Sequence, residues 1–474
     1  MPRRTRIVAT LGPATDRAGV LEELIEAGLD VARINFSHGI GEEPAKRIAR
    51  LRQLAKRLNR PVAVLADLPG PKLRVIIPHA LELKAKQHIT VAIRPDAEAD
   101  IRLTEPEAIA KIKAGQRVLL DDGRIQATVT SVNQNHVTIT VVVPGTLLPN
   151  KGINLPDTEL SIPAVTKRDR DALAVAFEAG VDWLALSFVR DAAAAHELRG
   201  VVRGYGLDLP IIAKIERPEA VQKSDEIIQA FDGIMVARGD LGVEIPLEKV
   251  PHVQKRLINQ ARVAGKPVIT ATDMLDSMKH NPRPTRAEAS DVANAVYDGT
   301  DAVMLSGETA VGEYPVAALT CMDQILREAE VNQAEDGPRH VSVPRGQLTD
   351  HITHMTVELA TEVRAEAIIA PTITGKTARL VARHRPRAAI VAVTGETVVR
   401  QLSVVWGVQA VAYPFEVKEG DDRLDAAVRA AFIGGAVPVG ALAVVLAGHP
   451  IEGGEGLPTI RVVRIGEGGK ACEP

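Results

Sequence analysis

Eight short runs of apolar, often β-branched residues recur along the chain, and each is followed by polar or glycine-rich residues. After most of them comes a stretch with helical periodicity, so the pattern predicts strands that alternate with helices. The runs lie at residues 7–12, 31–37, 62–68, 183–188, 211–216, 233–240, 267–274 and 302–309. Eight such units close into a (β/α)8 barrel, or TIM barrel, whose reactive groups lie at the carboxyl ends of the strands. We therefore expect an α/β protein with its functional site at those ends.

The interval between the third and fourth runs is too long for one helix, and its pattern changes to alternating strand segments. RVLLDDGRIQATVTSV and HVTITVVV alternate apolar and polar residues, and Asp122 and Gly123 between two of these strands are typical of a hairpin turn. We predict a small β-barrel domain over 75–156, inserted between barrel parts at 1–74 and 157–338. Both of its connections leave from the catalytic end, which favours a lid. A domain without a catalytic role is the alternative.

The polar segment EDGPRHVSVPRGQ is typical of a linker. After it, apolar runs at 367–370, 389–393, 409–414, 442–447 and 460–465 alternate with helical segments. This predicts a separate α/β domain over 339–474 with a mostly parallel sheet. The uncharged stretch 430–448 approaches the length of a membrane span, but glycines and a proline interrupt it, so we interpret it as a helix end, a turn and a buried strand.

The composition excludes several classes of protein. The 474 residues suffice for about three domains, and 46% apolar with 25% charged residues is typical of a soluble globular protein. The net charge of -3 argues against a general binder of nucleic acid or membrane surfaces. Cys321 and Cys472 are too few for a disulfide framework or a multi-cysteine metal site, and no signal peptide is evident, which favours the cytoplasm.

Polar and apolar residues alternate in the second run, VARINFSHG. Arg33, Asn35 and Ser37 would therefore share one face of a strand. Burying three polar groups inside a barrel is unfavourable unless they have partners, so a polar ligand or ion is expected there. A polar layer whose members satisfy one another is the alternative.

The fifth and sixth runs add charged residues at their carboxyl ends. Lys214 and Glu216 share a face in IIAKIE, and Asp240 ends the sixth run in VARGDLG, where glycines allow close backbone approach. A simple salt bridge would explain a cation beside carboxylates. Two carboxylates from adjacent strands also suit Mg2+, which takes one or two protein carboxylates and completes its shell with water and substrate oxygens.

The seventh and eighth runs end in TATDML and MLSGET. They place Thr270 with Thr272, and Ser306 with Glu308, at a spacing of two; these groups either relay a proton or satisfy one another. Together with Asp67 on the third run, six strand ends then present polar or ionisable groups to one mouth of the barrel. This concentration indicates a catalytic site.

The motifs that contain these residues resemble the pyruvate kinase family. The matching strings are TRIVATLGPAT, VARINFSHG, DDGRI, KGINLP, AKIERPEA, GIMVARGDLGVEIP, PRPTRAEASDVANAV and VMLSGETAVGEYP, and the resemblance extends from residue 5 to about 465. It implies transfer of a phosphoryl group from phosphoenolpyruvate to ADP, which gives ATP and an enolate that is protonated to pyruvate. It also implies a homotetramer.

The resemblance further implies a role for each site residue. Arg33 and Lys214 would hold the phosphoryl group, and Glu216 and Asp240 would bind Mg2+, or Mn2+ in its place. The carboxylate end of the substrate would lie beside Gly239, Asp240 and Thr272, with Ser306 and Glu308 in the loop associated with enolate protonation. Nucleotide contacts would come from Asn35, Ser37, His38 and Arg74, with Lys151 on the lid. Such a clamp of cations suits a reaction that brings two polyanions together.

One loop departs from the family pattern. Many members have Asp-Thr-Lys-Gly-Pro-Glu after the third strand and hold K+ there; in this chain the positions of that site are Asn35, Ser37, Asp67 and Leu68. The loop DLPGPK places Lys72 where the Glu stands. We expect the Lys72 ammonium to supply the charge that K+ brings, so that K+ is not required. A solvated Lys72 paired with Asp67 is the alternative. Asp273 also replaces a common Gln, and we have no account of that change.

The segment APTITGKTARL places a Thr- and Gly-rich turn between a strand and a helix. Ala370 stands where a nucleotide P-loop requires its first Gly, which excludes that motif. The resemblance implies that this loop holds the phosphate of an allosteric activator, through Thr372, Thr374, Gly375, Lys376 and Thr377. A helix cap made by Thr374 or Thr377 is the alternative. The later loop AGHPIEGGEGLPT has Glu452 and Glu455 but no Lys or Arg, which favours a monophosphate, such as a sugar monophosphate or AMP, over fructose 1,6-bisphosphate.

Two other classes of protein would share part of this pattern. A barrel lyase acting on pyruvate-like acids also uses a Glu and an Asp on Mg2+, but it would not need Lys151 on a lid. A metabolite sensor without activity would be expected to lose one or more of Arg33, Lys214, Glu216 and Asp240, and all four are present.

Overall fold

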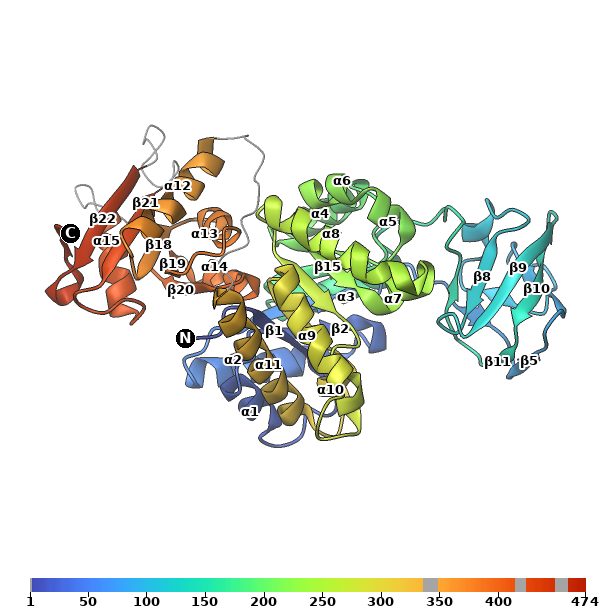
Figure 1. Ribbon diagram of the computed structural model, residues 1–474. Coiled ribbons are helices and arrows are strands. Elements are labelled where there is room, and N and C mark those ends of the chain that lie inside the picture. Colours follow the sequence, from blue (N-terminus) through green and yellow to red (C-terminus); the bar gives the residue numbers. More distant parts are fainter. Residues whose placement is uncertain (1, 336–347, 414–422, 448–458) are drawn as a thin grey trace.

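A computed structural model describes residues 2–335, 348–413, 423–447 and 459–474. The chain forms three parts in a row, with a barrel in the middle, an inserted β domain at one end and an α/β domain at the other (Figure 1). The predicted domain boundaries at 74, 156 and 338 stay predictions.

The barrel is the closed, parallel, eight-stranded barrel that the sequence pattern predicts, with the order β1-β17-β16-β15-β14-β13-β3-β2. Its strands are β1 (Arg6–Thr10), β2 (Val31–Asn35), β3 (Ala63–Asp67), β13 (Trp183–Leu186), β14 (Ile211–Ile215), β15 (Gly233–Ala237), β16 (Val268–Ala271) and β17 (Ala302–Leu305). The strands are almost completely buried. Side chains of one apolar cluster fill the interior of the barrel, and a second apolar cluster lies between the outer face of the strands and the helices.

Helices surround the barrel and follow its strands. They are α1 (Val20–Glu26), α2 (Glu42–Arg57), α3 (Lys167–Glu178), α4 (Ala193–Gly204), α5 (Pro218–Gln222), α6 (Ser224–Ala230), α7 (Arg238–Glu244), α8 (Val250–Val263), α9 (Arg286–Asp298), α10 (Gly307–Ala310) and α11 (Pro315–Glu335). Short 3-10 turns lie at η1 (Phe36–His38), η3 (Leu247–Lys249) and η4 (Asp276–Lys279). Capping boxes start α3, at Thr166 and Asp169, and α9, at Thr285 and Glu288.

The inserted segment is built from short antiparallel strands around one apolar core. These are β4 (Val75–Ile76), β5 (Leu81–Leu83), β6 (His88–Ala92), β7 (Arg102–Leu103), β8 (Arg117–Leu120), β9 (Ile125–Val132), β10 (His136–Val143), β11 (Gly145–Leu147) and β12 (Ile153–Asn154), with the 3-10 turn η2 (Pro106–Ile109). They pair as a five-stranded sheet, β12-β8-β9-β10-β6, and two two-stranded sheets. Asp121, Asp122 and Gly123 have positive φ and turn the chain between β8 and β9, which confirms the predicted hairpin.

The C-terminal part is an α/β domain with a six-stranded sheet, in the order β20-β19-β18-β21-β22-β23. Its elements are α12 (Leu348–Glu362), β18 (Ala367–Pro371), α13 (Lys376–Ala382), β19 (Ala389–Thr394), α14 (Glu396–Gln401), η5 (Leu402–Val404), β20 (Val408–Ala412), α15 (Arg423–Ile433), β21 (Leu442–Ala447), β22 (Thr459–Ile465), η6 (Glu467–Gly469) and β23 (Ala471–Cys472). The first four strands in that order are parallel, and β22 and β23 are antiparallel. The expectation of a mostly parallel sheet is therefore confirmed.

The stretch 430–448 consists of the end of α15, a turn and the buried strand β21, as predicted, with residue 448 outside the described residues. Among the described residues, no helix has both the length and the apolar character needed to cross a membrane. The linker residues 336–347, and Glu452 and Glu455 of the later loop, lie outside the described residues.

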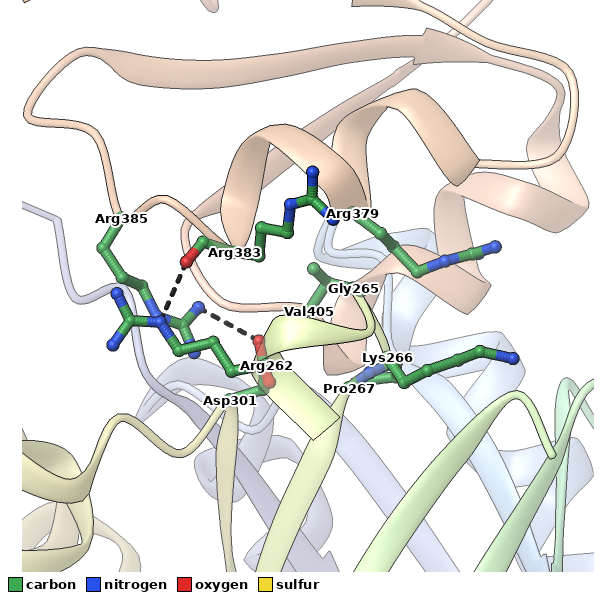
Figure 2. Close-up of a pocket in the computed structure, with 9 residues that line it drawn as sticks. All are labelled: Arg262, Gly265, Lys266, Pro267, Asp301, Arg379, Arg383, Arg385 and Val405. Carbon is green, nitrogen blue, oxygen red and sulfur yellow. Dashed lines mark hydrogen bonds and ion pairs between the residues drawn. The ribbon is translucent and has the colours of Figure 1, made fainter. Parts of the chain in front are cut away.

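The C-terminal domain packs against the amino ends of the barrel strands. The turn before β16 lies under α13, with Gly265 close to the helix (Figure 2). A Cβ built on Gly265 would come within 2.7 Å of Leu380 Cδ2, and its φ of +66° also favours glycine. The two domains are therefore in close contact at this turn.

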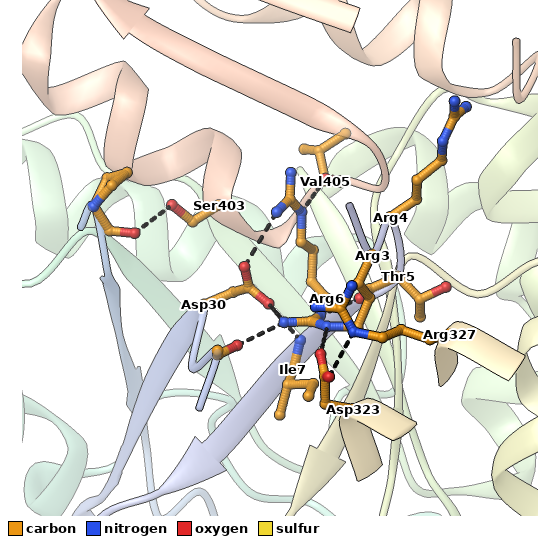
Figure 3. A network of polar contacts seen from close by, with 12 residues as sticks. Arg3, Arg4, Thr5, Arg6, Ile7, Asp30, Asp323, Arg327, Ser403 and Val405 are labelled. Carbon is orange, nitrogen blue, oxygen red and sulfur yellow. Dashed lines mark hydrogen bonds and ion pairs between the residues drawn. The ribbon is translucent and has the colours of Figure 1, made fainter. Parts of the chain in front are cut away.

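The N-terminal segment fastens the same junction (Figure 3). Asp30, at the start of β2, pairs with Arg3 at 2.9 Å and with Arg6 at 3.1 Å, and Arg6 Nε donates to the carbonyl of Val405 at 3.0 Å. The Arg4 guanidinium lies 5.1 Å from the ring centre of Trp406, within cation–π range. Arginines at the beginning of the chain thus connect the barrel to the C-terminal domain.

Candidate active site

Arg33 and Asp67 form an ion pair at the carboxyl ends of the neighbouring strands β2 and β3. Arg33 Nε lies 2.7 Å from Asp67 Oδ2, and Arg33 Nη1 donates to Thr10 Oγ1 at 3.0 Å. All three side chains are buried. One strand therefore directs its guanidinium across the barrel mouth, where a carboxylate and a hydroxyl fix its orientation.

Lys214 lies at the centre of the site. Its Nζ is 2.9 Å from Glu216 Oε1 and 3.3 Å from Asp67 Oδ1, and it donates to Ser187 Oγ at 2.7 Å. Lys214 and Glu216 thus lie side by side, as their spacing of two predicts. The salt bridge expected as the alternative to a metal site is also present, since Lys214 pairs with both carboxylates.

Burial and charge shift the pKa values of this cluster in different directions. Burial opposes the charged form of Asp67, but the nearby Lys214 and Arg33 outweigh it and lower the pKa of Asp67. Burial raises the pKa of Glu216 to about 7, against the opposing charge of Lys214. Burial favours neutral Lys214, but Asp67 and Glu216 outweigh it and raise the pKa of the lysine. Lys214 is thus a fixed cation at neutral pH, because its carboxylate neighbours hold its proton.

Asp240 and Gly239 lie in the first turn of α7, directly after β15 ends at Ala237. The prediction that the sixth strand runs to Asp240 is therefore wrong at its end, because the chain turns into a helix there. Asp240 remains close enough to Glu216 to raise the pKa of that carboxyl. Its side chain is 32% exposed, whereas that of Glu216 is fully buried, so the accessible carboxylate of the pair is Asp240.

A strained turn after β16 presents Thr272. Thr272 and Asp273 have φ of +70° and +54°, a conformation that few non-glycine residues adopt. Thr272 Oγ1 accepts a hydrogen bond from Gly239 N at 2.8 Å and donates to the carbonyl of Ala271 at 2.5 Å. Arg238 Nη2 donates to the carbonyl of Thr272 at 2.6 Å and so supports the turn from outside. The hydroxyl is thereby held beside the Gly239 backbone.

Ser306 and Glu308 follow β17, which ends at Leu305, and Glu308 lies in α10 rather than on the strand. The Glu308 carboxylate accepts hydrogen bonds from Ser306 N at 2.7 Å and Leu275 N at 3.1 Å, so it fixes the turn between two strand ends. Burial raises its pKa. Ser306 Oγ is buried without a hydrogen-bond partner among the described residues. Thr270, in contrast, is satisfied by Thr300 at 3.0 Å.

The predicted nucleotide residues divide into two groups. Asn35 Oδ1 accepts from Ser37 N at 3.0 Å, and Ser37 lies in η1, so the predicted strand alternation ends at Asn35. His38 is in the same turn, but its side chain falls outside the described part of the structure. Arg74, at the root of the inserted domain, donates through Nη1 to the carbonyl of Asn150 at 2.9 Å. Lys151 pairs with Asp121 at 2.7 Å within the inserted domain.

Lys72 connects the barrel site to the inserted domain. Its Nζ lies 3.5 Å from Asp240 Oδ1 and 3.4 Å from Asp122 Oδ1. The alternative that Lys72 pairs with Asp67 is therefore wrong, since Asp67 is already engaged by Arg33 and Lys214. The ammonium lies instead at the carboxylate predicted to bind Mg2+.

Glu216 and Asp240 have the donor set that Mg2+ prefers. Glu216 Oε1 is buried and receives no aligned hydrogen bond within the described residues, although Lys214 Nζ is near, and Asp240 is partly exposed. The described residues contain no group of three or more His, Cys, Asp or Glu that could hold a metal ion. Two hard oxygen ligands with open positions fit Mg2+, which takes its other ligands from water and substrate.

The predicted effector loop follows β18. Gly375, with φ of +76°, is the residue before α13, and no side chain caps this helix. The alternative of a cap made by Thr374 or Thr377 is therefore wrong. The carbonyl of Thr374 accepts a hydrogen bond from Arg379 Nη1 at 3.1 Å, and Thr372 is buried.

Three residues of the site were not predicted. Thr10 and Ser187 orient Arg33 and Lys214, and each is a single hydroxyl at the end of an apolar run, in VATLG and LALSF. Inspecting the end of every barrel strand for a single polar residue would have identified both Thr10 and Ser187. Arg238, which also pairs with Asp291 at 2.7 Å, immediately precedes the GDLG motif, but its support of the next strand end depends on folding.

Comparisons with known proteins agree with this architecture. Residues 2–319 match the model of the pyruvate kinase barrel domain, and residues 350–463 match that of the pyruvate kinase alpha/beta domain. The pyruvate kinase of Geobacillus stearothermophilus is 45% identical over 461 residues, which cover 95% of this chain and 78% of that protein. Pyruvate kinase 2 of Synechocystis is 45% identical over 418 residues, which cover 86% of this chain and 70% of that protein.

The fold agrees with a solved structure as well. The crystal structure of a pyruvate kinase from Cryptosporidium parvum superposes with a TM-score of 0.88 at 34% sequence identity, covering 98% of this chain and 96% of the other. Both domain models, the relatives and this structure point to one family over nearly the whole length. The chain belongs to the pyruvate kinase family and is an enzyme of that class.

Proposed function

We propose that the protein transfers the phosphoryl group of phosphoenolpyruvate to ADP and releases pyruvate and ATP. The observation that carries the proposal is the cluster at the barrel mouth, in which the cations Arg33 and Lys214 lie beside the carboxylates Asp67 and Glu216. In the free protein these charges neutralise one another. The oxygens of an incoming phosphate would share these cations with the carboxylates, which keep the cations in position for an anion.

In this reaction the bond between phosphorus and the enol oxygen breaks, and a bond to a terminal oxygen of ADP forms. Negative charge spreads over the transferring group, and fixed cations stabilise it. Lys214 fits this role because Glu216, Asp67 and Ser187 hold its ammonium in place. Arg33 is fixed in the same way by Asp67 and Thr10, so neither cation needs to reorganise during the transfer.

Glu216 and Asp240 would hold Mg2+, with Mn2+ as a substitute. When bound, the ion would neutralise charge on the substrate phosphates. Burial raises the pKa of Glu216, and a bound cation would favour its ionised form. Lys72, 3.5 Å from Asp240, would have to move aside or share that carboxylate.

The carboxylate end of the substrate would bind at Gly239 and Thr272. The strained turn at Thr272 places its hydroxyl beside Gly239 N, and an incoming carboxylate oxygen would accept from both groups in place of their present acceptors, Thr272 Oγ1 and the carbonyl of Ala271. After transfer the enolate takes a proton at carbon and becomes pyruvate. Ser306 Oγ has no hydrogen-bond partner among the described residues, and we assign it to the path of that proton together with Thr272 and Glu308.

The nucleotide would lie between Asn35, Ser37 and His38 on the barrel and Arg74 and Lys151 on the lid. Lys151 is paired with Asp121, so ADP has to displace an internal carboxylate from it. Closure of the inserted domain would bring Lys151 to the phosphates and exclude water, which otherwise competes for the phosphoryl group.

We also propose that K+ is not required. Both oxygens of Asp67 face cations of the chain, and the carbonyl of Leu68 accepts from Ser187 Oγ at 2.7 Å. The Lys72 ammonium supplies a further positive charge at Asp240. These side chains leave little electrostatic need for a monovalent ion at the family's K+ positions.

Regulation and assembly are inferred from the family resemblance. A phosphorylated monoester would bind the loop of Thr372, Thr374, Gly375, Lys376 and Thr377 and raise the affinity for phosphoenolpyruvate, and the enzyme would be a homotetramer. No side chain caps α13, which begins after the left-handed Gly375, so backbone N–H groups at the start of the helix could donate to an anion.

A coupled assay of pyruvate formation tests the reaction when phosphoenolpyruvate, ADP and Mg2+ are omitted one at a time. The proposal expects product only when all three are present. Pyruvate that forms without ADP would support a lyase or phosphatase instead, and no turnover with all three present would support a metabolite sensor.

A further inference from the structure

A shallow hollow lies between the barrel and the C-terminal domain, at the amino ends of β16 and β17, and opens to solvent (Figure 2). It lies away from the candidate active site, which is at the carboxyl ends of the same strands. Five of its lining side chains are cationic and one is anionic. They are Arg262, Lys266, Arg379, Arg383, Arg385 and Asp301.

Three of these cations hold the two domains together. Arg385 pairs with Asp301 at 3.1 Å, and Arg262 Nε donates to the carbonyl of Arg383 at 2.8 Å. Arg383 pairs with Asp350 at 2.9 Å within the C-terminal domain, and its Nη1 donates to the carbonyl of Val263 in the barrel at 3.3 Å. Their charges are used within the fold, so they explain the junction but not the excess of positive charge in the hollow.

Lys266 and Arg379 are different, because neither forms an ion pair with a carboxylate of the described residues. Lys266 Nζ donates to the carbonyl of Phe231, and Arg379 Nη1 donates to the carbonyl of Thr374 at 3.1 Å. One side chain comes from the barrel and the other from α13, and both extend toward the same side of the hollow (Figure 2). Two cations from different domains thus line the same hollow, and neither has an ion-pair partner among the described residues.

The surroundings increase this imbalance. Asp232 is the carboxylate that acts on both cations, but it already accepts from Arg199 Nη2 at 2.8 Å. Arg199 and Lys376 repel the Lys266 ammonium electrostatically. Burial lowers the pKa of both Lys266 and Arg379, as expected for cations that lose water without gaining an ion pair with a carboxylate.

We propose that Lys266 and Arg379 bind a phosphate group between the barrel and the C-terminal domain. An ammonium and a guanidinium approaching from two sides match the charge and the several acceptor oxygens of a phosphate dianion. The hollow is open to solvent, so a phosphate group would lie at its mouth and the remainder of an organic phosphate would extend outward. Free phosphate and a phosphomonoester share this chemistry.

The position of the site links it to the active site. Lys266 immediately precedes Pro267 and β16, and Thr272 follows the other end of that strand. Arg379 contacts the predicted effector loop through Thr374. A phosphate held by both cations would tie α13 to the strand that presents Thr272. This effect on catalysis rests on the proposed function, whereas the binding site itself does not.

Tryptophan fluorescence is a direct readout of binding. The chain has two tryptophans, and both lie at this junction. Trp183 Nε1 donates to the carbonyl of Gln401 at 2.9 Å, and the Arg385 guanidinium lies 4.6 Å from the ring centre of Trp406. The full chain is titrated with inorganic phosphate at constant ionic strength, without phosphoenolpyruvate or ADP. We expect a saturable change in fluorescence.

Four substitutions identify the site. Lys266→Gln and Arg379→Gln should each weaken phosphate binding about tenfold, the effect of one lost hydrogen bond to a charged group. Arg379→Lys retains the charge and should bind more tightly than Arg379→Gln. Lys56→Gln removes the same charge from an exposed position on α2 and should bind like the wild type. Thermal unfolding without phosphate checks that each variant is folded.

Three results would overturn the proposal. The first is a wild-type fluorescence response that does not saturate by roughly 50 mM phosphate. The second is equal affinity for phosphate in the wild type and both glutamine variants. The third is loss of phosphate binding in Thr377→Ala but not in Lys266→Gln, a result that would assign the anion to the effector loop. Parallel titrations with glycerol 3-phosphate and AMP separate the sources. Tighter binding of either supports an organic phosphate as ligand, and equal binding supports free phosphate. Because no substrate is present, failure here leaves the proposed reaction standing.

Discussion

Replacing Lys214 by methionine should remove most of the turnover without unfolding the protein. The side chains have similar lengths, so the change deletes a cation while largely keeping its volume. One unit charge about 4 Å from another is worth about 4 kcal/mol at an effective dielectric of 20. At about 1.4 kcal/mol per factor of ten, loss of this interaction in the transition state predicts a fall in kcat of about 10^3.

The structure indicates how stability and catalysis can be separated in this variant. Glu216 loses its ion pair at 2.9 Å, but its pKa is already raised to about 7, so it can take up a proton instead of remaining a buried charge. Asp67 keeps Arg33 as a partner at 2.7 Å. We therefore expect the variant to fold, and its circular dichroism and thermal unfolding should show this.

The assay is pyruvate formation at saturating phosphoenolpyruvate, ADP and Mg2+. Lys56→Met, at an exposed position of α2, is the matched control. Lys214→Arg, which keeps the charge in a different shape, should be more active than Lys214→Met. A folded Lys214→Met enzyme with a tenth of the wild-type kcat would refute the role assigned to this lysine.

Two further changes test other parts of the account. Lys72→Glu reverses a charge 3.5 Å from Asp240, so the activity of this variant without K+ should fall at least about tenfold, and added K+ should restore it. The wild-type enzyme should be equally active when a large organic cation replaces K+. Steep activation of the wild type by K+ would contradict this prediction. Asp30→Asn breaks buried pairs with Arg3 and Arg6 and should lower stability by about 3 kcal/mol at pH 7, measured by calorimetry. Burial opposes ionisation of Asp30, but Arg3 and Arg6 outweigh it and lower its folded pKa, so this contribution is present above the unfolded pKa of about 4 and is lost as pH falls through the folded value. A stability difference between wild type and Asp30→Asn that does not shrink below about pH 4 would show that the ion pairs are not its source.

The barrel strands could be predicted from the sequence because each buried, β-branched run indicates one strand of a βα unit. The residues at which the strands end could not be predicted in this way. Ser37, Asp240 and Glu308 were placed on strands, but each lies in a helical turn that begins just after its strand. The predicted groups still gather at one mouth, because a turn directly after a strand remains at the same end of the barrel.

Contacts between separate parts of the chain were beyond sequence reasoning. Lys72 meets Asp240 of α7 and Asp122 of the inserted domain, and the pairing of β8 with β12 brings Lys151 to Asp121. Ser187 was missed for a related reason, since a single serine after an apolar run is too common to stand out. Spacing identifies residues that share an element, whereas pairs between elements depend on packing.

The most direct test of the central claim follows the phosphorus atom itself. Phosphorus NMR of phosphoenolpyruvate and ADP with the Mg2+-loaded enzyme should show the substrate signal disappearing as the γ-phosphate signal of ATP appears, in equal amounts. The same mixture with Lys214→Met should change about a thousand times more slowly. Release of inorganic phosphate without ATP, or no change with the wild-type enzyme, would contradict phosphoryl transfer between these two substrates.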